Sequence, residues 1–345
     1  MSTPLILAAI VVVILAALLV RAQIKIKGLE MPATPPGPDT LGPEGWVELP
    51  HAWGRSLSDI TVTAHDVFWE SDGNHRFVHF YGRVNGFDGF DQGHFIGNAP
   101  WEIPAIGVSA TQWDALKSTM DVRKPFQNFI VGRIDQNGRL RYGSMSGTPV
   151  FDAFGKFNGY RAASRDVTAQ CKAQMQMQIK DEVTRILASS QRLSDAMAGL
   201  LEAVCKPLSW NYGARWMRDP RDDHFVCGEI WAQGSAQPLV DASKKERVAV
   251  AGDDLLARAW NAKQMVWVTD VQTDSGLPRR AAAEAAGLHA AFALPVLVQD
   301  DCVCVLEFYG PRIQRRDELI DSVCESVNHQ VALFWLRREI GRAHV

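Results

Sequence analysis

The stretch from residue 147 to residue 168, GTPVFDAFGKFNGYRAASRDVT, constrains the fold of this chain more than any other segment. It predicts a strand over residues 147–151, a tight turn over 152–155 and a second strand over 156–167. Asp152 and Gly155 suit the turn, because Asp and Gly tolerate the backbone angles that a tight hairpin needs. The strand pattern stops within residues 165–168 and a long helical pattern begins there, so we expect a sheet to hand over to a helix at this point.

The length of the chain allows two domains, and its charge gives no sign of nucleic-acid binding. A chain of 345 residues can form about two domains that each bury a core of their own. The net charge is -3, and no block of like charge occurs anywhere in the sequence. We therefore expect no nucleic-acid partner.

The six cysteines are scattered and include no CxxC pair. Cys302 and Cys304 alternate within an apolar run, so we expect them on one face of a strand, where they cannot easily bridge each other. We interpret all six as buried, reduced thiols of a cytosolic protein.

Residues 4–20 are seventeen apolar residues without a charge, just long enough to cross a bilayer as a helix. Arg21, Lys25 and Lys27 follow at once, and the positive-inside rule then places the rest of the chain in the cytoplasm. A cleaved secretory signal is the alternative, although such a signal carries its positive charge before the apolar core. We expect residues 1–27 to be a single-pass anchor in the cell inner membrane, with the lipid bilayer as its partner.

Residues 28–56 predict a tether between this anchor and the folded part of the chain. Residues 28–50 contain six prolines and four glycines, a composition that cannot hold a helix. We expect an extended, semi-rigid segment that does not transmit a movement of the membrane helix.

Residues 57–168 predict a compact mixed region with five strands. The expected strands lie near residues 67–70, 76–81, 127–135, 139–146 leading directly into 147–151, and 156–167. Helices are expected near residues 58–64 and 111–119, and the helices concentrate between the second and third strands.

Four segments of this region resemble successive blocks of one bacterial PAS subgroup. They are AHDVFWESDGNHRFVHF, IGNAPWEIP, RKPFQNFIVGRIDQNGRLRYGSMSGTPVFD and GYRAASRDVT, which together cover about 110 residues in the right order. The resemblance implies a PAS domain over residues 57–168, and PAS domains function in sensing. It does not specify a ligand.

After this region, residues 170–205 carry apolar side chains mostly at three- and four-residue spacing, which predicts helix. Strands are expected near residues 210–217, 264–270 and 302–309, with a helix-to-strand segment at 287–298 and a closing helix at 315–338.

This order resembles a GAF domain, notably in WNYGARW, LLARAWNAKQMVWVTDV, AGLHAAFALPV and VCVLEFYG. The resemblance covers residues 182–338 and leaves residues 169–181 as a helical linker. The fold class that we expect is therefore α+β, with a PAS and then a GAF domain, each an antiparallel sheet with flanking helices.

Catalytic machinery is not evident, so we expect no enzymatic activity in this chain. His329 lies on the closing helix but is followed by Gln330, unlike the phospho-accepting site of a histidine kinase, and we interpret it as solvated or dimer-facing. The sequence contains no GGDEF-like run, no GxxxxGK segment and no paired His or Cys spacing for zinc. We expect no metal site.

In the PAS-like region the ligand-pocket candidates are Trp69, Phe77, Trp101 and Phe129, together with Phe80. Aromatic side chains on strands are more often ordinary core, and that alternative stays open. His79 and His94 could suggest haem, although lone histidines are usually satisfied or exposed. No cysteine precedes Cys171, so a photoreactive flavin site has no counterpart.

In the GAF-like region the ligand lid of the family would fall between residues 247 and 287. Its candidates are Arg258, Trp260 and Trp267, which suit a small-molecule pocket and plain packing equally well. Residues 228–301 contain no cysteine, which argues against an attached bilin. The cofactor and the small-molecule ligand stay unknown.

The closing helix carries an apolar stripe at Ile320, Val323, Val327, Val331 and Phe334. This stripe predicts packing on the GAF sheet. The alternative is that the C-terminal end of the helix pairs with a second copy, so we expect a homodimer.

Residues 339–345, EIGRAHV, do not continue the helical pattern. One back-translation matches the start of a sequencing adapter, so we expect a non-native, adapter-derived tail and a missing output domain. The chain is then a membrane-anchored sensory module whose parent is a sensor histidine kinase or a diguanylate cyclase. The alternative is a complete adaptor that regulates a separate partner.

Overall fold

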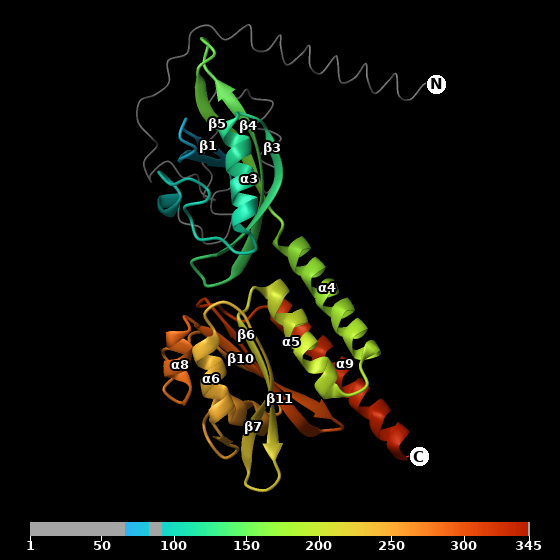
Figure 1. The fold of residues 1–345 in the computed structure, drawn as a ribbon. Helices are drawn as coiled ribbons and strands as arrows, with labels where there is room; N and C mark the ends of the chain where they lie inside the picture. Colours follow the sequence, from blue (N-terminus) through green and yellow to red (C-terminus); the bar gives the residue numbers. More distant parts are fainter. Residues whose placement is uncertain (1–65, 83–91, 344–345) are drawn as a thin grey trace, which may run out of the picture.

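The computed structural model describes residues 66–82 and 92–343, which form two α+β units built on antiparallel sheets (Figure 1). The expected anchor at residues 1–27, the tether at 28–56 and the helix near 58–64 lie outside the described residues. Within the described ranges, none of the helices combines the length and the apolar character needed to span a bilayer.

The first unit contains a five-stranded antiparallel sheet in the order β2-β1-β5-β4-β3. Its strands are β1 (Asp66–Ser71), β2 (Phe77–Gly82), β3 (Phe126–Ile134), β4 (Leu140–Phe151) and β5 (Phe157–Asp166). Helix α3 (Ala110–Asp121) packs Leu116 and Met120 into the core on one face, and a short 3-10 turn η4 (Gln92–His94) precedes it. All five predicted strands and the helix near residues 111–119 are confirmed.

Three turns of this unit use the same side-chain chemistry, at Asp72, Asp135 and Asp152. In each, one carboxylate oxygen accepts hydrogen bonds from the backbone N–H groups two and four residues later. At Asp152 the donors are Phe154 and Lys156, at 2.8 and 2.9 Å. Aspartate therefore fixes these turns by accepting hydrogen bonds as well as by tolerating their backbone angles.

The second unit contains a six-stranded antiparallel sheet in the order β8-β7-β6-β11-β10-β9. Its strands are β6 (Tyr212–Asp219), β7 (His224–Ala232), β8 (Val248–Ala249), β9 (Val266–Val268), β10 (Ala290–Val298) and β11 (Asp301–Gly310). Its helices and the helix leading into it are α4 (Thr168–Ser189), α5 (Leu193–Leu208), α6 (Gln237–Lys245), α7 (Leu255–Ala262), α8 (Arg280–Ala285) and α9 (Glu318–Ala343).

Helices cover both faces of this second sheet. On β10, Phe292 and Leu294 face a core formed with α4, α5 and α9, whereas Ala291 and Ala293 face a second core under α6, α7 and α8. This alternation is the period-two pattern of a strand buried on both sides.

A bulge in β11 corrects one expectation about the cysteines. Cys304 pairs with Val296 and Cys302 pairs with Leu297, which leaves Val303 without a partner. As a result Cys304 packs on the α5/α9 side and Cys302 on the α6–α8 side, so the expectation that they share a face was wrong. All six cysteines of the chain are free.

The helical segment after the first sheet is two helices and not one. The backbone is extended at Ser190 and Arg192, which ends α4 and begins α5. The break lets both helices pack against the same core, through Ile179 and Val183 on α4 and Leu200 on α5.

The closing helix α9 begins at Glu318 and continues to Ala343, past residue 338, where the apolar pattern stops. The predicted stripe packs as expected, with Ile320, Val323, Val327 and Val331 buried in the core that faces α5, and Phe334 partly buried beside it.

The segment at residues 165–168 joins the two units. Asp166 accepts a hydrogen bond from the Thr168 N–H at 2.7 Å, and the Thr168 hydroxyl accepts one from the Tyr142 N–H at 2.9 Å. The Val167 N–H donates to the Tyr142 carbonyl at 2.9 Å. Helix α4 is therefore fastened to β4 at its first residue, and it then lies beside α5 and α9 (Figure 1).

One glycine of β5 tests the packing of this first sheet. Gly159 has a φ of 107°, and a Cβ built on it would lie 1.8 Å from the Ser71 carbonyl oxygen. We expect Gly159→Ala to lower the free energy of unfolding by more than about 2 kcal/mol in urea denaturation, because both strain and overlap must be relieved. Gly155→Ala in the neighbouring turn, where no atom lies within 4 Å of the built Cβ, should cost about 1 kcal/mol. Equal losses for the two variants would contradict this explanation.

Candidate functional site

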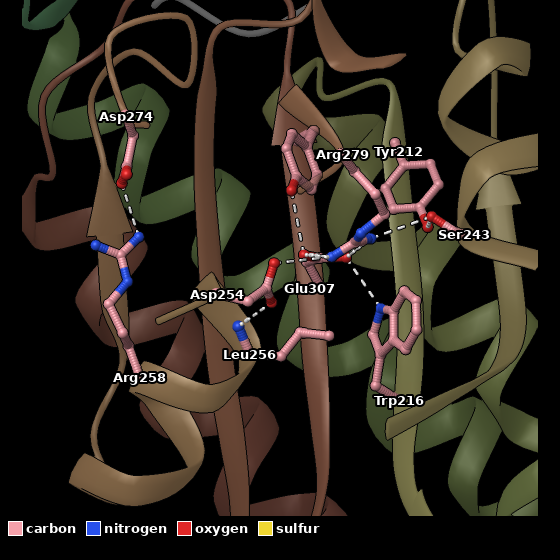
Figure 2. A network of polar contacts seen from close by, with 10 residues as sticks. Tyr212, Trp216, Ser243, Asp254, Leu256, Arg258, Asp274, Arg279 and Glu307 are labelled. Carbon is pink, nitrogen blue, oxygen red and sulfur yellow. Dashed lines mark hydrogen bonds and ion pairs between the residues drawn. The ribbon is translucent and has the colours of Figure 1, made fainter. Parts of the chain in front are cut away.

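A buried polar network lies between the second sheet and helices α6–α8 (Figure 2). At its centre Arg279, immediately before α8, faces Glu307 on β11. The Arg279 Nη1 and Nη2 atoms donate to Glu307 Oε2 and Oε1 at 2.8 and 2.7 Å. The two side chains are 1% and 0% exposed, so this is a bidentate ion pair inside the domain.

The pleat of β11 places Glu307 in this interior. Its neighbours Val305 and Tyr309 face the same α6–α8 core, whereas Leu306 faces the opposite core. The Trp216 Nε1–H donates to Glu307 Oε2 at 2.9 Å, and the Tyr309 hydroxyl donates to Oε1 at 3.2 Å. Among the described residues, the carboxylate therefore receives hydrogen bonds from three side chains.

The guanidinium is held just as closely. Arg279 Nη1 also donates to the Ser243 hydroxyl at 3.1 Å, and that hydroxyl accepts from the Tyr212 hydroxyl at 2.8 Å. The guanidinium carbon lies 4.5 Å from the centre of the Trp216 ring, in cation–π contact. Burial opposes the charge, but the Glu307 carboxylate dominates with its neighbours and raises the pKa of Arg279 well above its usual value.

Asp254 adds a second carboxylate to the network. It caps the N-terminus of α7 by accepting a hydrogen bond from the Leu256 N–H at 2.8 Å, and its Oδ2 lies 3.8 Å from Arg279 Nη2. Burial raises the pKa of Asp254 to about 6, and the nearby Glu307 charge adds to this while Arg279 opposes it. The network thus ties α6, α7, α8 and two strands together through one cation that faces two acids.

The network leaves one polar atom without a partner. Arg279 Nε is buried and makes no hydrogen bond to any of the described residues. The other two nitrogen atoms of the guanidinium donate to Glu307 and Ser243. The unpaired Nε is therefore on the side of the guanidinium that does not face Glu307.

Of the three candidates in the GAF-like region, Arg258 and Trp260 lie on the same side of the sheet as the network. Arg258 on α7 pairs with Asp274 at 2.8 Å (Figure 2), and Trp260 on the same helix packs its ring edge-on against Phe225, with centroids 5.3 Å apart. Trp267 lies on the other side of the sheet. It stacks on Phe292 at 5.8 Å and donates to the Gln314 carbonyl at 3.2 Å.

The candidates Trp69, Phe77, Trp101 and Phe129 of the first unit all belong to one aromatic core beside α3. Trp69 and Phe77 are buried and pack edge to face at 4.8 Å. Trp101 is partly buried, with the ammonium of Lys117 5.8 Å from its ring centre. Phe129 alone of the four lines a cavity of about 520 Å³ between α3, β3 and α4.

The candidates His79 and His94 lie on different elements of the first unit. His79 lies on β2 opposite Glu70, and His94 ends the turn η4. In the described parts of the chain, no cluster of three or more His, Cys, Asp or Glu side chains could hold a metal ion.

Comparison with known proteins identifies the second unit. The sequence profile of the family described as "GAF domain" matches residues 190–334. Residues 190–334 form a GAF domain. The match encloses β6 to β11 and the whole polar network. A search of curated proteins found no match to the chain.

Solved structures similar to the chain include the GAF domain of a phosphoenolpyruvate-protein phosphotransferase from Coxiella burnetii, at 14% identity and a TM-score of 0.42, covering 50% of this chain and 98% of that chain. A free methionine-R-sulfoxide reductase from Neisseria meningitidis is similar at 14% identity and a TM-score of 0.39, covering 49% and 93%. The nlh2 GAF domain of A. aeolicus is similar at 11% identity and a TM-score of 0.38, covering 48% and 99%. The GAF assignment rests on the family match.

The central pair gives a direct test of the network. Breaking a buried ion pair from one side strands the other charge, so we expect Glu307→Gln to lower the free energy of unfolding by about 3–5 kcal/mol in urea denaturation. Asp223→Asn is the matched control, because Asp223 and Arg218 form a pair in which both side chains are about half exposed. The control should cost less than about 1 kcal/mol, and a Glu307→Gln variant of control-like stability would overturn the structural role of the pair.

Asp254 predicts a pH dependence of known sign. The folded state holds the Asp254 proton up to about pH 6, whereas the unfolded chain releases it near pH 4, so the contribution of this group to stability falls as the pH rises through that window. Asp254→Asn keeps an N-cap acceptor but does not titrate. The stability of the wild type relative to this variant should fall by on the order of 2 kcal/mol between about pH 4 and pH 7. A difference that is constant with pH, measured by urea denaturation, would contradict the raised pKa.

Proposed function

We propose that this chain is a membrane-anchored sensory module that detects a cytoplasmic cue and relays it through helices to an output. In this proposal the first unit is a PAS domain, the second is the GAF domain, and residues 4–20 anchor both at the inner membrane. The output is a histidine kinase or diguanylate cyclase domain of the same polypeptide, and a second copy of the chain pairs with it along α9.

The observation that carries this proposal is that α4 belongs to both units. Its first residue, Thr168, is hydrogen-bonded to β4 of the first sheet. Further along, Lys172 pairs with Asp317, just before α9, at 2.7 Å, and Thr184 donates to Gln330 on α9 at 2.8 Å. A shift of the first sheet therefore reaches the helix that closes the GAF domain without crossing a flexible linker.

The shape of the first unit supports its interpretation as a PAS domain. Its strand order places the first and last strands, β1 and β5, side by side at the centre, and its helix α3 comes between β2 and β3 in the chain. Five strands with a helix between the second and third are what the sequence resemblance leads us to expect. Strand β5, which leads into α4, pairs on both sides and so lies within the sheet.

The state of the cysteines argues against a role in thiol catalysis. Burial raises the pKa of every cysteine in the chain, from the partly buried Cys171 to the fully buried Cys205 and Cys304. A thiol nucleophile needs the opposite shift. The two acids of the polar network are closed off as well, because the Glu307 and Asp254 side chains are 0% and 4% exposed.

An adaptor that acts on a separate partner is the alternative within the same structure. It would use the same two sensor units and the same helices, and only the location of the output would differ. Leu333 on α9 is a large apolar side chain that is 38% exposed, and it offers a contact to either a second copy or another protein.

Thr168 provides the test of the relay. Thr168→Val removes the acceptor of the buried Tyr142 N–H, at a cost of about 1–3 kcal/mol. We expect hydrogen exchange of the full chain to become at least about tenfold faster in the first turns of α4 and at the start of α9.

Thr168→Ser is the matched control, because it keeps the hydroxyl and should leave exchange near the wild-type rate. Faster exchange confined to β4, with α4 and α9 unchanged, would show that the two units are not coupled through this residue.

A further inference from the structure

A cavity of about 340 Å³ lies where the two units meet, apart from the GAF network. Its walls come from η4, the loop at residues 103–106 and the end of β3, all in the first unit. Arg312, from the segment that joins β11 to α9, completes the lining. A ligand in this cavity would therefore contact both domains.

Arg133 on β3 is a buried cation in this lining, and no carboxylate of the described residues pairs with it. Only 7% of the residue is exposed, and its Nη1 donates to the Ile103 and Pro104 carbonyls at 3.0 and 2.9 Å, while its Nη2 donates to the Pro100 carbonyl at 3.1 Å. The guanidinium carbon lies 5.4 Å from the centre of the Phe95 ring. These contacts fix the position of the guanidinium but do not neutralise its charge. Burial alone lowers the pKa of Arg133 to about 10.

Arg312 brings a second uncompensated charge from the other domain. Its side chain is half-buried, and burial lowers its pKa. Within the described ranges it has no hydrogen bond or ion pair from its guanidinium, although its backbone carbonyl accepts from the Ala290 N–H at 3.1 Å. The backbone is thus fixed by the GAF sheet while the charged head is left available.

Asp135, the one acid that the described residues contribute to the lining, does not balance these two charges. The Asp135 side chain is fully buried, and its Oδ1 caps the β3–β4 turn by accepting from the Asn137 and Arg139 N–H groups. Its Oδ2 faces Arg141 at 3.4 Å. Because Arg141 offsets Asp135, the cavity retains an excess of positive charge from Arg133 and Arg312.

The cost of this arrangement distinguishes it from the GAF pair. A buried cation normally needs a paired anion to offset its loss of hydration. Arg279 has Glu307 and Asp254 for this purpose, whereas Arg133 has three uncharged carbonyls. A bound anion would supply the missing charge.

We propose that this interdomain cavity binds a small organic carboxylate, whose anionic group lies between Arg133 and Arg312 and whose apolar body contacts Phe95, Ile103 and Ile106. The carboxylate geometry matches the planar donor pairs of guanidinium groups. The apolar lining selects an organic anion over an inorganic one, because a small polyanion would leave those side chains in contact with water.

Such a ligand would act at the joint between the domains. Beside the cavity, the Arg315 N–H donates to the Gly138 carbonyl of the β3–β4 turn at 2.9 Å, which is a direct backbone contact between the two units. A ligand that bridges Arg133 and Arg312 would tighten this contact. Its role as a sensory input rests on the proposed function, but its binding does not.

Calorimetric titration of the full chain with benzoate tests the site, with benzamide and inorganic phosphate as comparison probes. We expect benzoate to bind and benzamide, which has the same shape without the charge, to bind at least tenfold more weakly. We expect phosphate to bind at least tenfold more weakly as well. No benzoate binding, or phosphate binding tighter than benzoate, would overturn the proposal.

Variants of Arg312 separate this site from other positive surfaces. Arg312→Ala removes no hydrogen bond or ion pair made by the described residues, so it should fold as the wild type does and weaken benzoate binding at least tenfold. Arg315→Ala, an exposed arginine three residues away that does not line the cavity, is the matched control and should leave binding unchanged. Equal losses in the two variants would overturn the proposal. Benzoate binding without any change in hydrogen exchange of α4 and α9 would uphold the site and count against the relay.

Discussion

The attachment of α4 to both units is the constraint on which the arrangement of this protein depends. At Thr168 the helix is hydrogen-bonded into the first sheet through Tyr142, and from Lys172 onward it is bound to the segment of α9. Its apolar side, with Ile179 and Val183, belongs to the core of the GAF domain. Near its start, Cys171 and Met175 pack against Leu140 and Tyr142 of the first unit. A helix that packs in two cores cannot reorient in one without disturbing the other, which is what the proposed relay between the units requires.

The protein treats its buried arginines in two different ways. Arg279 is enclosed by carboxylates, hydroxyls and the Trp216 ring, and it holds the α6–α8 layer of the GAF domain on its sheet. Among the described residues, Arg133 is held by backbone carbonyls and the Phe95 ring at the joint between the units, and the Arg312 guanidinium makes no hydrogen bond or ion pair. The first arrangement completes its own charge balance and stabilises a fold. In the second arrangement the positive charge is balanced by the proposed carboxylate ligand.

The sequence predicts the parts of this fold in which local pattern and tertiary structure agree. The hairpin at residues 147–168 was predictable because Asp152 and Gly155 specify their turn locally. The break between α4 and α5 and the bulge at Val303 depend on packing that no local pattern displays. Side-chain type and place in the expected lid region predict Arg258, Trp260 and Trp267, but they do not reveal the contacts of these residues. Glu307 is recognisable in the sequence as the lone acid in the apolar run CVCVLEFY. The roles of Arg279, Arg133 and Arg312 could not be predicted, because they depend on residues that are distant in the sequence and that the fold brings close.

The central claim is that α4 unites the two sheets into one cooperative unit. Native-state hydrogen exchange of the full chain at increasing urea concentration tests it most directly, through the amides of Tyr142 on β4 and Val183 on α4. If α4 couples the two sheets, these amides open with the same free energy and the same dependence on urea. Coupling through α4 would be contradicted if Val183 exchanged together with the GAF sheet while Tyr142 opened independently at a lower free energy.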